Sequence, residues 1–472
     1  MILAYDIGTT FLKGAVVAEN GKAVARAQVP VRAASHTRED RCEIDADSWL
    51  SGMALVTAQL GLRGKEGLRA VVVSANGPTL VPVSAEGEPL APAMSWMDRR
   101  AGEEAELIAE FTDSPVDPSF YLPKTFWVMR HEPALYEQTQ HFLPCAEFID
   151  LFLTGNAVRI IPSRLFSEFF WNEGAVARLG LDPDKLPPFA ETGEVIGSVS
   201  ARAADTLGLP AGLPVVAGGP DFIMSILGTA SVQPGRVCDR AGTSEGINLC
   251  WSAPVRSPRL LCFPHIVRGA YNISAMLCSS GAALEWAARS LGSRSPDVET
   301  LLGDIQGVPP GARRLLFLPF LGPERFPVWE ANMRGAFVGL TLDHGRREMM
   351  RAVAESSGFA VRAVLADMEA SGCQAGELRV SGGLARIPSW CQMRADITGR
   401  KVLQPEHEDA ELIGNACAGF YGLDDFDSLS AAAESMVRFK GTFTPDPRSA
   451  AVYGEMVDRF TKACACLGKT FS

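Results

Sequence analysis

A carboxylate, a glycine and two hydroxyl groups come together at the end of the first apolar segment of the chain. Asp6 closes the run of residues 2–6, and Gly8, Thr9 and Thr10 form the turn that follows. Backbone N–H groups and hydroxyls in such a turn can hold phosphate oxygens, whereas a carboxylate there would hold Mg²⁺. Because glycine and threonine are also ordinary turn residues, the segment taken alone fits a plain hairpin equally well.

A second turn of the same design lies in the other half of the chain. Gly242, Thr243 and Ser244 separate the strand-like residues 236–240 from a returning strand over residues 247–251. Two such turns that face each other could grip the two sides of a triphosphate chain. The pair indicates a phosphate ligand and an architectural duplication more strongly than either turn alone.

Asp221 follows an apolar strand that ends in two glycines and a proline. It opens the helical pattern of residues 222–227, where an aspartate can serve as an N-cap worth on the order of 1 kcal/mol. It could instead accept the proton of a substrate hydroxyl that attacks a γ-phosphate, a role that typically contributes a factor of about 10²–10⁴ in rate. The flanking glycines would let a substrate approach closely. Both interpretations of Asp221 stay open on these residues alone.

Gly382 and Gly383 form a third glycine turn, between a strand and the start of a helix. Such a turn can bring the backbone close against a flat ring or its phosphates. A lone glycine pair is weakly specific. Its sequel is more informative, because a helix over residues 392–396, a turn and strand over residues 399–402 and a glycine-alanine helix over residues 413–420 follow it.

The elements expected around these residues are those of an α/β protein. Three consecutive strands precede the first helix, which we expect to begin near Asp45 with Asp47 or Ser48 as its N-cap. A β-branched run over residues 68–74 is typical of a buried central strand with helices on both sides. The other expected strands and helices cover residues 2–6, 13–18, 23–31, 280–291, 346–371 and 387–398.

The turn-rich segment of residues 232–238 is where we place a domain boundary. The chain of 472 residues is long enough for two large domains. We therefore expect an N-terminal domain over residues 1–235 and a C-terminal domain over residues 236–472.

Composition excludes several classes of protein and partner. The net charge is −11, from 44 Lys plus Arg against 55 Asp plus Glu, and no basic block could track a nucleic-acid backbone. No apolar run reaches the length of a membrane span, and because the sequence opens on a strand pattern we expect no secretory leader. Eleven cysteines, mostly in apolar segments, suit buried thiols in a reducing compartment, so we expect a cytoplasmic protein without a sulfur-bound metal.

Taken together, these motifs resemble those of the FGGY carbohydrate kinases, most nearly the xylulokinases among them. The resemblance covers essentially the whole chain and rests on Asp6-Ile-Gly-Thr-Thr, Gly218-Gly-Pro-Asp221, Gly242-Thr-Ser and Gly382-Gly with Gln392, Ala395-Asp396, Gly399 and Val402. Family-like segments between the motifs are Gly87-Glu-Pro-Leu, Trp96-Met-Asp-Arg99, Lys124 with Trp127, and Leu153-Thr-Gly155.

The resemblance implies a two-domain, actin-like fold of the ribonuclease H and hexokinase type, whose duplicated domains close over ATP and a sugar. The N-terminal domain would bind the sugar and the C-terminal domain the nucleotide. Asp221 would be the base that deprotonates the sugar hydroxyl, and Asp6 would organise Mg²⁺. The residues implied to surround the nucleotide are Gly8, Thr9, Thr10, Lys13, Gly242, Thr243, Ser244, Gly281, Gly382 and Gly383.

The chain departs from the family pattern where the sugar should bind. Ser74-Ala75-Asn76-Gly77 stands where xylulokinases usually carry Gln-Met-His-Gly, so Asn76 replaces the sugar-contacting histidine. Asn76 can still hydrogen-bond vicinal hydroxyls, but Ala75 offers less packing surface than methionine, which puts xylulose in question as the substrate. Glu147 stands where an aspartate is common, and Phe166 where a small residue often lines the pocket.

Asp98 and Arg99 allow two interpretations, because they could contact the substrate or simply pair with each other. Asn76 and Asp98 are accordingly the residues that we expect on the substrate side. Glu147 could equally be a buried structural carboxylate that pairs with a base.

The main hypothesis is an ATP-dependent kinase of a ketose or polyol, with Mg²⁺ as cofactor. Its rivals are an actin-like nucleotide switch that phosphorylates nothing and a sugar sensor that has lost catalysis through the change at Asn76. Asp221 and the sugar-domain segments argue against the switch. The oligomeric state stays open between a monomer and a homodimer, because no helix carries a long apolar heptad pattern.

Overall fold

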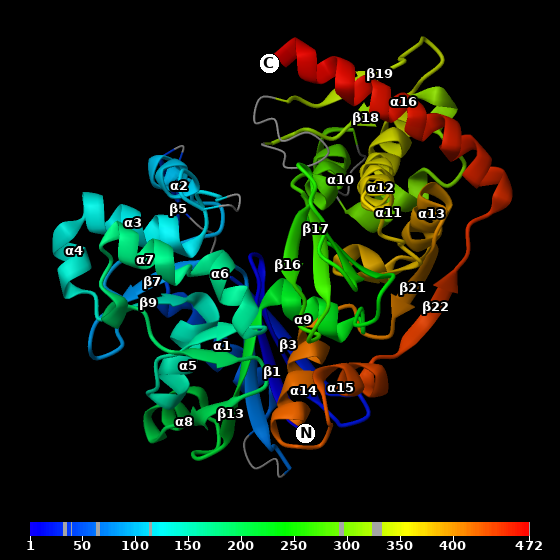
Figure 1. Cartoon of the computed structure of the whole chain (residues 1–472). Helices are drawn as coiled ribbons and strands as arrows, with labels where there is room; N and C mark the ends of the chain where they lie inside the picture. Colours follow the sequence, from blue (N-terminus) through cyan, green and yellow to red (C-terminus); the bar gives the residue numbers. More distant parts are fainter. Residues whose placement is uncertain are drawn as a thin grey trace. The chain divides into compact units, whose positions relative to one another are not determined.

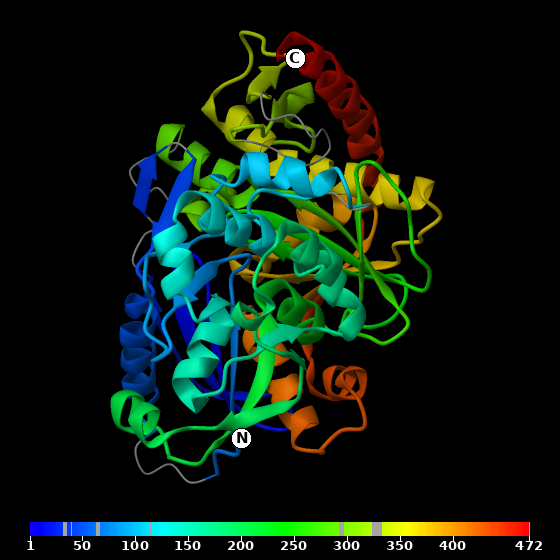
Figure 2. The same cartoon turned by 60° about the vertical axis from the view of Figure 1, so that its left-hand side comes forward.

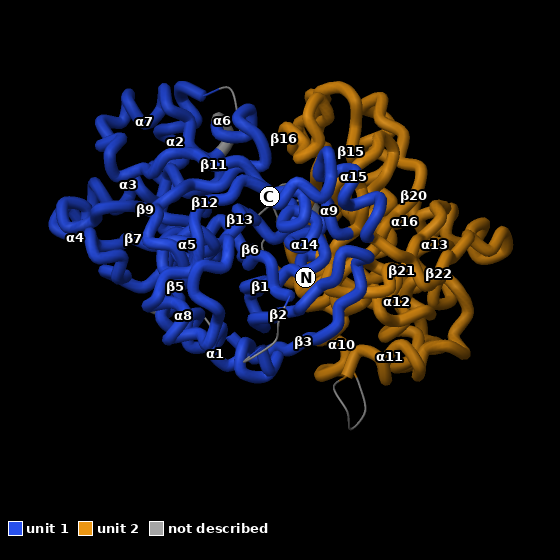
Figure 3. The backbone as a smooth tube through the Cα atoms, turned by 90° about the horizontal axis from the view of Figure 1, so that it is seen from below, with its two compact units in different colours: residues 1–228, 411–436 blue, residues 229–410, 437–472 orange. Residues whose placement is uncertain are grey.

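The structure is a computed structural model that describes residues 1–31, 35–38, 40–62, 67–112, 116–291, 297–322 and 333–471. The chain forms two compact units (Figure 3). Unit 1 consists of residues 1–228 and 411–436, and unit 2 of residues 229–410 and 437–472. The division differs from the expected one, because the chain returns to unit 1 after completing most of unit 2.

The main sheet of unit 1 has six strands in the order β12-β13-β6-β1-β2-β3. β1, β6 and β13 run parallel, while β2, β3 and β12 are antiparallel to their neighbours. The strands are β1 (Ile2–Ile7), β2 (Phe11–Val17), β3 (Ala23–Pro30), β6 (Ala70–Ala75), β12 (Val195–Ser198) and β13 (Pro214–Pro220).

Helices cover both faces of this sheet, as the continuous apolar sequences of its central strands predict. All residues of β1 and β6 are buried. α1 (Asp47–Leu60) packs on β2 and β3, and α5 (Cys145–Thr154) packs on β6 and β13 (Figure 1). From the returning segment, α14 (Ala410–Gly422) brings Gly419 against Ile2 and Val72.

The rest of unit 1 is built on a second, five-stranded sheet in the order β4-β5-β8-β7-β9 and a two-stranded pair, β10 and β11. These strands are β4 (Ser35–Arg38), β5 (Arg41–Ile44), β7 (Leu80–Val83), β8 (Ala93–Met94), β9 (His141–Pro144), β10 (Arg159–Ile161) and β11 (Phe189–Glu191). The remaining α-helices of the unit are α2 (Gly102–Ala109), α3 (Tyr121–His131), α4 (Pro133–Gln138), α6 (Ser167–Phe170), α7 (Glu173–Leu179), α8 (Ala201–Leu207), α9 (Asp221–Gly228) and α15 (Leu429–Met436).

The main sheet of unit 2 has seven strands in the order β16-β17-β15-β14-β20-β21-β22, and β18 pairs with β19. Its long C-terminal helix, red in Figures 1 and 2, packs on two further helices of the unit, α12 and α13. The strands are β14 (Arg236–Ala241), β15 (Glu245–Trp251), β16 (Leu261–Pro264), β17 (Tyr271–Leu277), β18 (Leu316–Leu318), β19 (Ala336–Val338), β20 (Glu377–Ser381), β21 (Lys401–Pro405) and β22 (Phe439–Phe443). The α-helices are α10 (Ser280–Ser290), α11 (Val298–Asp304), α12 (Arg346–Ala370), α13 (Pro388–Thr398) and α16 (Pro447–Phe471).

The two main sheets share one topology. In unit 1 the series β3-β2-β1-β6-β13-β12 has antiparallel, antiparallel, parallel, parallel and antiparallel neighbours. In unit 2 the series β17-β15-β14-β20-β21-β22 repeats that pattern. This repetition confirms the duplication that the two similar turns predict.

The start of the first helix corrects one expectation. α1 begins at Asp47, and its N-cap is Ala46, which makes no side-chain cap hydrogen bond. The prediction of Asp47 or Ser48 as N-cap is therefore wrong. Asp45 takes part instead, because its Oδ1 accepts a hydrogen bond from the N–H of Asp47 and its carbonyl accepts one from the Ser48 hydroxyl.

The pattern of strands and helices is otherwise close to the expected one. The three initial strands and the helices expected over residues 280–291, 346–371 and 387–398 are present within a residue or two of their predicted bounds. Within the described ranges, the structure contains no helix that is both long and apolar enough to cross a bilayer.

Candidate functional site

The carboxyl ends of three parallel strands bring several predicted residues of unit 1 to one edge of its main sheet. Asp6 lies beside Ser74 in the pairing of β1 with β6, and Gly219 lies beside Ser74 in the pairing of β13 with β6. Asn76 directly follows β6, and Asp221 directly follows β13. Ligands of open α/β sheets bind in general at this edge.

Asp6 is a buried carboxylate in an acidic environment. The Ser74 hydroxyl donates a hydrogen bond of 2.9 Å to its Oδ1. Burial first, and then the charges of Glu411 and Asp221, raise the pKa of the Asp6 carboxyl well above its ordinary value, although Lys13 and Ser74 act in the opposite direction.

These surroundings fit a magnesium ion. Mg²⁺ is usually held by one or two carboxylates together with water and phosphate oxygens, rather than by a complete set of protein ligands. The residues that the structure describes contain no cluster of three or more His, Cys, Asp or Glu side chains arranged for a metal. A divalent cation near Asp6 would offset the excess of negative charge that raises its pKa.

The turn after β1 presents its hydroxyls outward. Thr9 and Thr10 are exposed, and the indole Nε1 of Trp96 donates a hydrogen bond of 3.1 Å to the Thr9 hydroxyl. The N–H of Gly8 donates to the carbonyl of Phe11 within the hairpin, and a Cβ on Gly8 would lie 2.9 Å from that carbonyl oxygen. Gly8 is therefore required for the tightness of the turn.

Lys13 completes this edge from β2. It lies opposite Asp6 in the antiparallel pairing of β1 with β2. Its ammonium group is one of the influences that lower the pKa of Asp6. The hairpin thus places one cation next to the buried carboxylate.

The glycines before Asp221 have a structural cause. A Cβ on Gly218 would lie 2.2 Å from the carbonyl oxygen of Val73, and Gly219 has a φ of +133°. Gly218 thus makes room for the adjacent strand β6. The sequence had suggested that it makes room for a substrate. The register between β13 and β6 shifts at this point, and α9 begins at Asp221 immediately afterwards.

Asn76 is buried and both ends of its amide are engaged. Its Nδ2 donates a hydrogen bond of 2.8 Å to the carbonyl of Ile7, and its Oδ1 accepts one of 2.8 Å from the Thr79 hydroxyl. The first bond connects the end of β6 to the end of β1, and the second lies within the loop after β6. Asn76 therefore shapes the loop that leaves the sheet edge.

Asp98 is fully buried and pairs with Arg100. Nε of Arg100 lies 2.8 Å from Oδ1 of Asp98 and Nη2 lies 2.7 Å from Oδ2, while the N–H of Cys42 donates to Oδ2 at 2.8 Å. Arg99 pairs instead with Asp117 at 3.2 Å. The interpretation that Asp98 and Arg99 pair with each other is therefore wrong.

Lys124 holds the loops behind Asn76 and Asp98 together. Its ammonium is fully buried and donates to the carbonyls of Pro78, Met94 and Ser95 at 2.8, 3.2 and 2.7 Å. Burial lowers the pKa of Lys124 to about 7. The sequence assigned no role to Lys124 beyond its family-like position, and the contacts give it a structural one.

Aromatic side chains line the start of α9. Phe166 is buried, with its ring centroid 6.5 Å from that of Phe222, the residue after Asp221. Tyr121 stacks on Trp171 with centroids 5.2 Å apart. These rings form a wall in unit 1 next to the proposed base.

Glu147 is a buried carboxylate in α5. Its Oε1 accepts a hydrogen bond of 3.0 Å from the N–H of Ile160. Burial raises the pKa of Glu147 to about 7, although Arg159 and the backbone hydrogen bonds lower it. The hydrogen bond from Ile160 in β10 thus supports a structural role for Glu147.

In unit 2, the predicted turn of Gly242, Thr243 and Ser244 connects β14 to β15. Gly242 and Ser244 are hydrogen-bonded across the turn, and Thr243 is exposed. The N–H groups of Gly281 and Ala282, in the first turn of α10, donate to the carbonyls of Gly242 and Thr243. A Cβ on Gly281 would lie 2.2 Å from the Gly242 oxygen, so this contact requires glycine.

The two glycines after β20 have different surroundings. Gly382 has a φ of +83°, and a Cβ there would lie 2.4 Å from the carbonyl oxygen of Ala241. Gly383 has open space at its Cβ position. The first glycine therefore fits the turn against β14, and the second leaves room beside it.

A buried charge network supports the turn of unit 2, and no pattern in the sequence predicts it. Nη2 of Arg394 lies 2.8 Å from Oε1 of Glu245, and its Nε lies 3.6 Å from Asp239. The Ser280 hydroxyl donates to the other oxygen of Glu245. Burial raises the pKa of Glu245 well above its ordinary value, against the influence of Arg394. Arg394 lies in a predicted helix, and its sequence does not distinguish a buried arginine from an exposed one.

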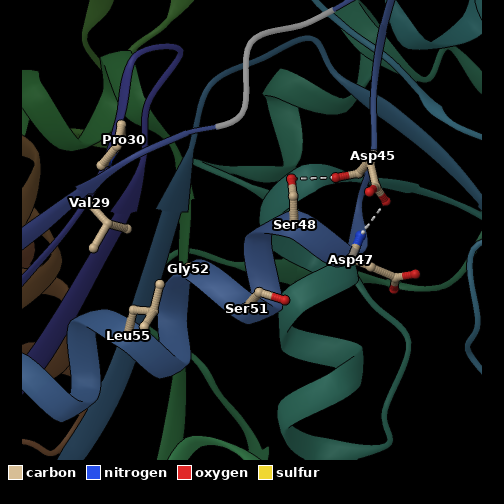
Figure 4. A pocket seen from close by; sticks show the side chains of 8 residues that line it. All are labelled: Val29, Pro30, Asp45, Asp47, Ser48, Ser51, Gly52 and Leu55. Carbon is tan, nitrogen blue, oxygen red and sulfur yellow. Dashed lines mark hydrogen bonds between the residues drawn. The ribbon is translucent and has the colours of Figure 1, made fainter.

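A pocket of about 310 Å³ lies in unit 1, at the start of α1 (Figure 4). It is formed between the end of β3 and the first turns of α1, with Pro30, Asp45 and Leu55 in its wall. None of the predicted site residues lines it. We do not assign it to the site.

Two polar residues of α14 belong to the site of unit 1 and were not predicted from the sequence. Asn415 Nδ2 donates to Ser74 Oγ at 2.9 Å, and Glu411 Oε1 accepts from Ser225 at 2.6 Å. Their signal was weak, because they are single polar residues in a helix noted only for glycine and alanine.

Comparisons with known proteins match this chain to one protein family over nearly its whole length. Residues 1–228 match the N-terminal domain, and residues 240–423 the C-terminal domain, of the FGGY family of carbohydrate kinases. The chain is 26% identical to a xylulose kinase of Lactococcus lactis, over 96% of this chain and 94% of that protein. It is also 26% identical to a gluconokinase of Bacillus subtilis, over 97% and 94% respectively. A solved structure of ligand-bound xylulose kinase from Lactobacillus acidophilus matches with a TM-score of 0.89 and 23% identity, over 100% of this chain and 99% of that one.

Proposed function

Because the chain belongs to the FGGY family of carbohydrate kinases, we propose that Asp221 is the base of its ATP-dependent phosphorylation of a sugar. The family membership confirms the two-domain kinase fold and the sugar kinase activity expected from the sequence. The observation that carries the proposal is the position of Asp221 at the carboxyl end of β13, in the same sheet edge as Asp6.

The proposed step is a single in-line transfer. A substrate hydroxyl gives its proton to the Asp221 carboxylate while its oxygen forms a bond to the γ-phosphorus of ATP. The bond from that phosphorus to the β–γ bridging oxygen breaks, and ADP leaves with the electron pair. The phenyl ring of Phe222 and the aromatic wall beside it would help to keep water from the phosphoryl group.

Mg²⁺ is the proposed metal cofactor, with Asp6 as the residue that organises it. When bound, the ion would neutralise charge on the phosphate oxygens. Ser74 and Lys13 would hold the Asp6 carboxylate from the protein side, through the hydrogen bond to Oδ1 and through charge.

We assign donors of each unit to the nucleotide phosphates. In unit 1 we assign this part to Lys13 and to the turn of Gly8, Thr9 and Thr10, whose hydroxyls face outward. In unit 2 we assign it to Gly242, Thr243 and Ser244, with Gly281, Gly382 and Gly383 bordering the nucleotide. The open space at Gly383 supports its assignment.

The substrate is proposed to be a ketose or polyol, in keeping with the xylulose kinases among the relatives. The gluconokinases among them extend the test to sugar acids. Asn76 and Asp98 stay the proposed substrate-side residues. Their engaged hydrogen-bond sites favour a role in shaping the loops around the sugar over direct contact. No observation favours the nucleotide switch or the sugar sensor.

A cytoplasmic location is proposed from the cysteines. None of the eleven forms a disulfide in the structure, which suits a reducing compartment. A homodimer stays a prediction, and light scattering on the purified protein tests it.

The test is a coupled ADP-release assay with ATP, Mg²⁺ and a panel of ketoses, polyols and sugar acids. We expect turnover on one of these classes and a loss of about 10²–10⁴-fold in kcat for Asp221→Asn, with little change in sugar KM. Leu165→Ala, an exposed change in the same unit, serves as the matched control. An Asp221→Asn protein with undiminished kcat would refute the assignment of the base.

A further inference from the structure

Asn415 is a buried polar residue that the proposed function does not yet explain. It lies within α14 and is completely buried. Asparagine is a poorer helix former than alanine. Its Oδ1 is buried and has no hydrogen-bond partner among the described residues, which costs stability. A residue that is unfavourable on both counts is expected where function requires it.

The other end of the amide has a defined orientation. Nδ2 of Asn415 donates to the carbonyl of Tyr5 at 2.8 Å and to the Ser74 hydroxyl oxygen at 2.9 Å. A backbone carbonyl can only accept, so the atom facing Tyr5 must be the nitrogen.

This orientation sets the direction of the Ser74 hydroxyl. Because its oxygen accepts from Asn415, its hydrogen is left to donate elsewhere. The nearer acceptor is Oδ1 of Asp6 at 2.9 Å, whereas the carbonyl of Tyr5 lies at 3.4 Å and already accepts from Asn415. The result is a directed chain from Asn415 through Ser74 to Asp6, and all three side chains are buried.

We propose that Asn415 and Ser74 are positioning residues that hold the Asp6 carboxylate in one orientation for Mg²⁺. The inference rests on the proposed function, because it takes Asp6 as the residue that organises Mg²⁺. Residues of this kind, one contact removed from a metal, typically change metal affinity or activity by about 10–100-fold when they are replaced.

The same helix is fixed against the helix that carries the proposed base. The Ser225 hydroxyl of α9 donates to Glu411 of α14 at 2.6 Å. A Cβ on Gly414 would lie 2.0 Å from the carbonyl oxygen of Met224, so the two helices touch along their backbones. α14 is therefore placed to hold Asp6 while it packs on the helix that begins with Asp221.

The test uses the full-length protein with Asn415→Ala, Ser74→Ala and the double variant. Cys417→Ala is the matched control, because it also removes a buried side chain from α14. Three readouts are needed: Mn²⁺ binding in the presence of ADP by electron paramagnetic resonance, kcat with KM for the sugar, and thermal unfolding. Wild-type binding that Asp6→Ala abolishes identifies the metal signal.

We expect Asn415→Ala and Ser74→Ala to weaken Mn²⁺ binding and kcat by about tenfold or more, with sugar KM nearly unchanged. Asn415→Ala should change the melting temperature little, because better helix propensity and the loss of the unpaired Oδ1 offset the two hydrogen bonds that Nδ2 loses. The double variant should lose no more than the worse single variant, because both act through one chain of bonds. Cys417→Ala should bind Mn²⁺ as the wild type does.

Normal Mn²⁺ binding by Asn415→Ala would overturn the proposal, as would losses that simply follow the melting temperature or add up in the double variant. A wild type that binds no Mn²⁺ with ADP would overturn it as well. A wild type that binds Mn²⁺ through Asp6 but phosphorylates no sugar would refute the proposed function alone, since the binding readout still decides the positioning.

Discussion

Asp98 and Arg99 are adjacent in the chain, but their ion pairs differ greatly in how much they stabilise the fold. Asp98 is fully buried against Arg100, whose side chain is 6% exposed, whereas Arg99 is 48% exposed where it pairs with Asp117. Breaking a buried ion pair typically costs about 3–5 kcal/mol. Without Asp98, the buried Arg100 keeps only Glu43, 2.6 Å from its Nη2, as a charge partner. Exposed pairs are worth about 1 kcal/mol or less.

We therefore expect Asp98→Ala to lower the free energy of unfolding by about 3 kcal/mol or more, and Arg99→Ala by less than about 1 kcal/mol. Urea unfolding of both variants measures the difference. Equal effects would mean that the buried pair is not the one seen in the structure. The sequence could locate this cluster of charges but not its pairing, because the choice of partner depends on which side chain turns inward.

Glu147 should make stability depend on pH. Burial raises its pKa to about 7 in the folded state, from an ordinary value of 4.5. The folded protein therefore favours the neutral acid. The stability that this group contributes is fully present below about pH 4.5 and is lost as the pH rises through about 7.

Glu147→Gln keeps an acceptor for the N–H of Ile160 and removes the titration. Between about pH 5 and pH 8 we expect the wild type to lose roughly 3 kcal/mol of unfolding free energy relative to this variant. Urea unfolding at the two pH values gives the comparison. A pH dependence that is the same in both proteins would show that Glu147 stays ionised when folded.

Among the elements, the close packing of α14 on α9 depends on a glycine. A Cβ on Gly414 would lie 2.0 Å from the backbone oxygen of Met224, and a backbone atom cannot move aside cheaply. Gly454, in α16, has nothing within 4 Å of its Cβ position. The same substitution should thus have opposite effects in the two helices.

We expect Gly414→Ala to destabilise the protein and to lower kcat, because α14 must shift from Asp6 and from α9. Gly454→Ala should stabilise it by about 0.5–1 kcal/mol through helix propensity alone. Thermal unfolding and the ADP-release assay check both. If Gly414→Ala were as stable and active as the wild type, α14 could not be a close-fitting support.

Most elements could be predicted because their signals are local. The hairpin of β1 and β2 and the helix α12 follow from apolar periodicity and turn residues within each segment. The N-cap of α1 differs from the prediction because Asp45, which precedes it, accepts hydrogen bonds that a cap would accept. The contact of Asn415 with Tyr5 could not be predicted, since no local pattern reports a pairing between residues 410 positions apart.

At the scale of the whole molecule, unit 1 is made from two distant pieces of chain. Residues 411–436 return to it after unit 2 has been started, and α14 then covers Ile2 and Val72 on one face of the main sheet. The division expected from the sequence, at residue 235, would remove α14 from that face. It would also leave Ser74 and Ser225 without their partners in α14.

We therefore expect a fragment of residues 1–235 not to unfold cooperatively by itself. A fragment in which residues 1–228 are joined to residues 411–436 by a glycine-serine linker should do so, because it restores α14 and the apolar area that this helix buries. Circular dichroism during heating, with two-dimensional NMR of each fragment, makes the comparison. A cooperative, well-dispersed 1–235 fragment would show that the returning segment is dispensable and would favour the simple division at residue 235. Failure of both fragments would mean that unit 1 needs unit 2 in order to fold.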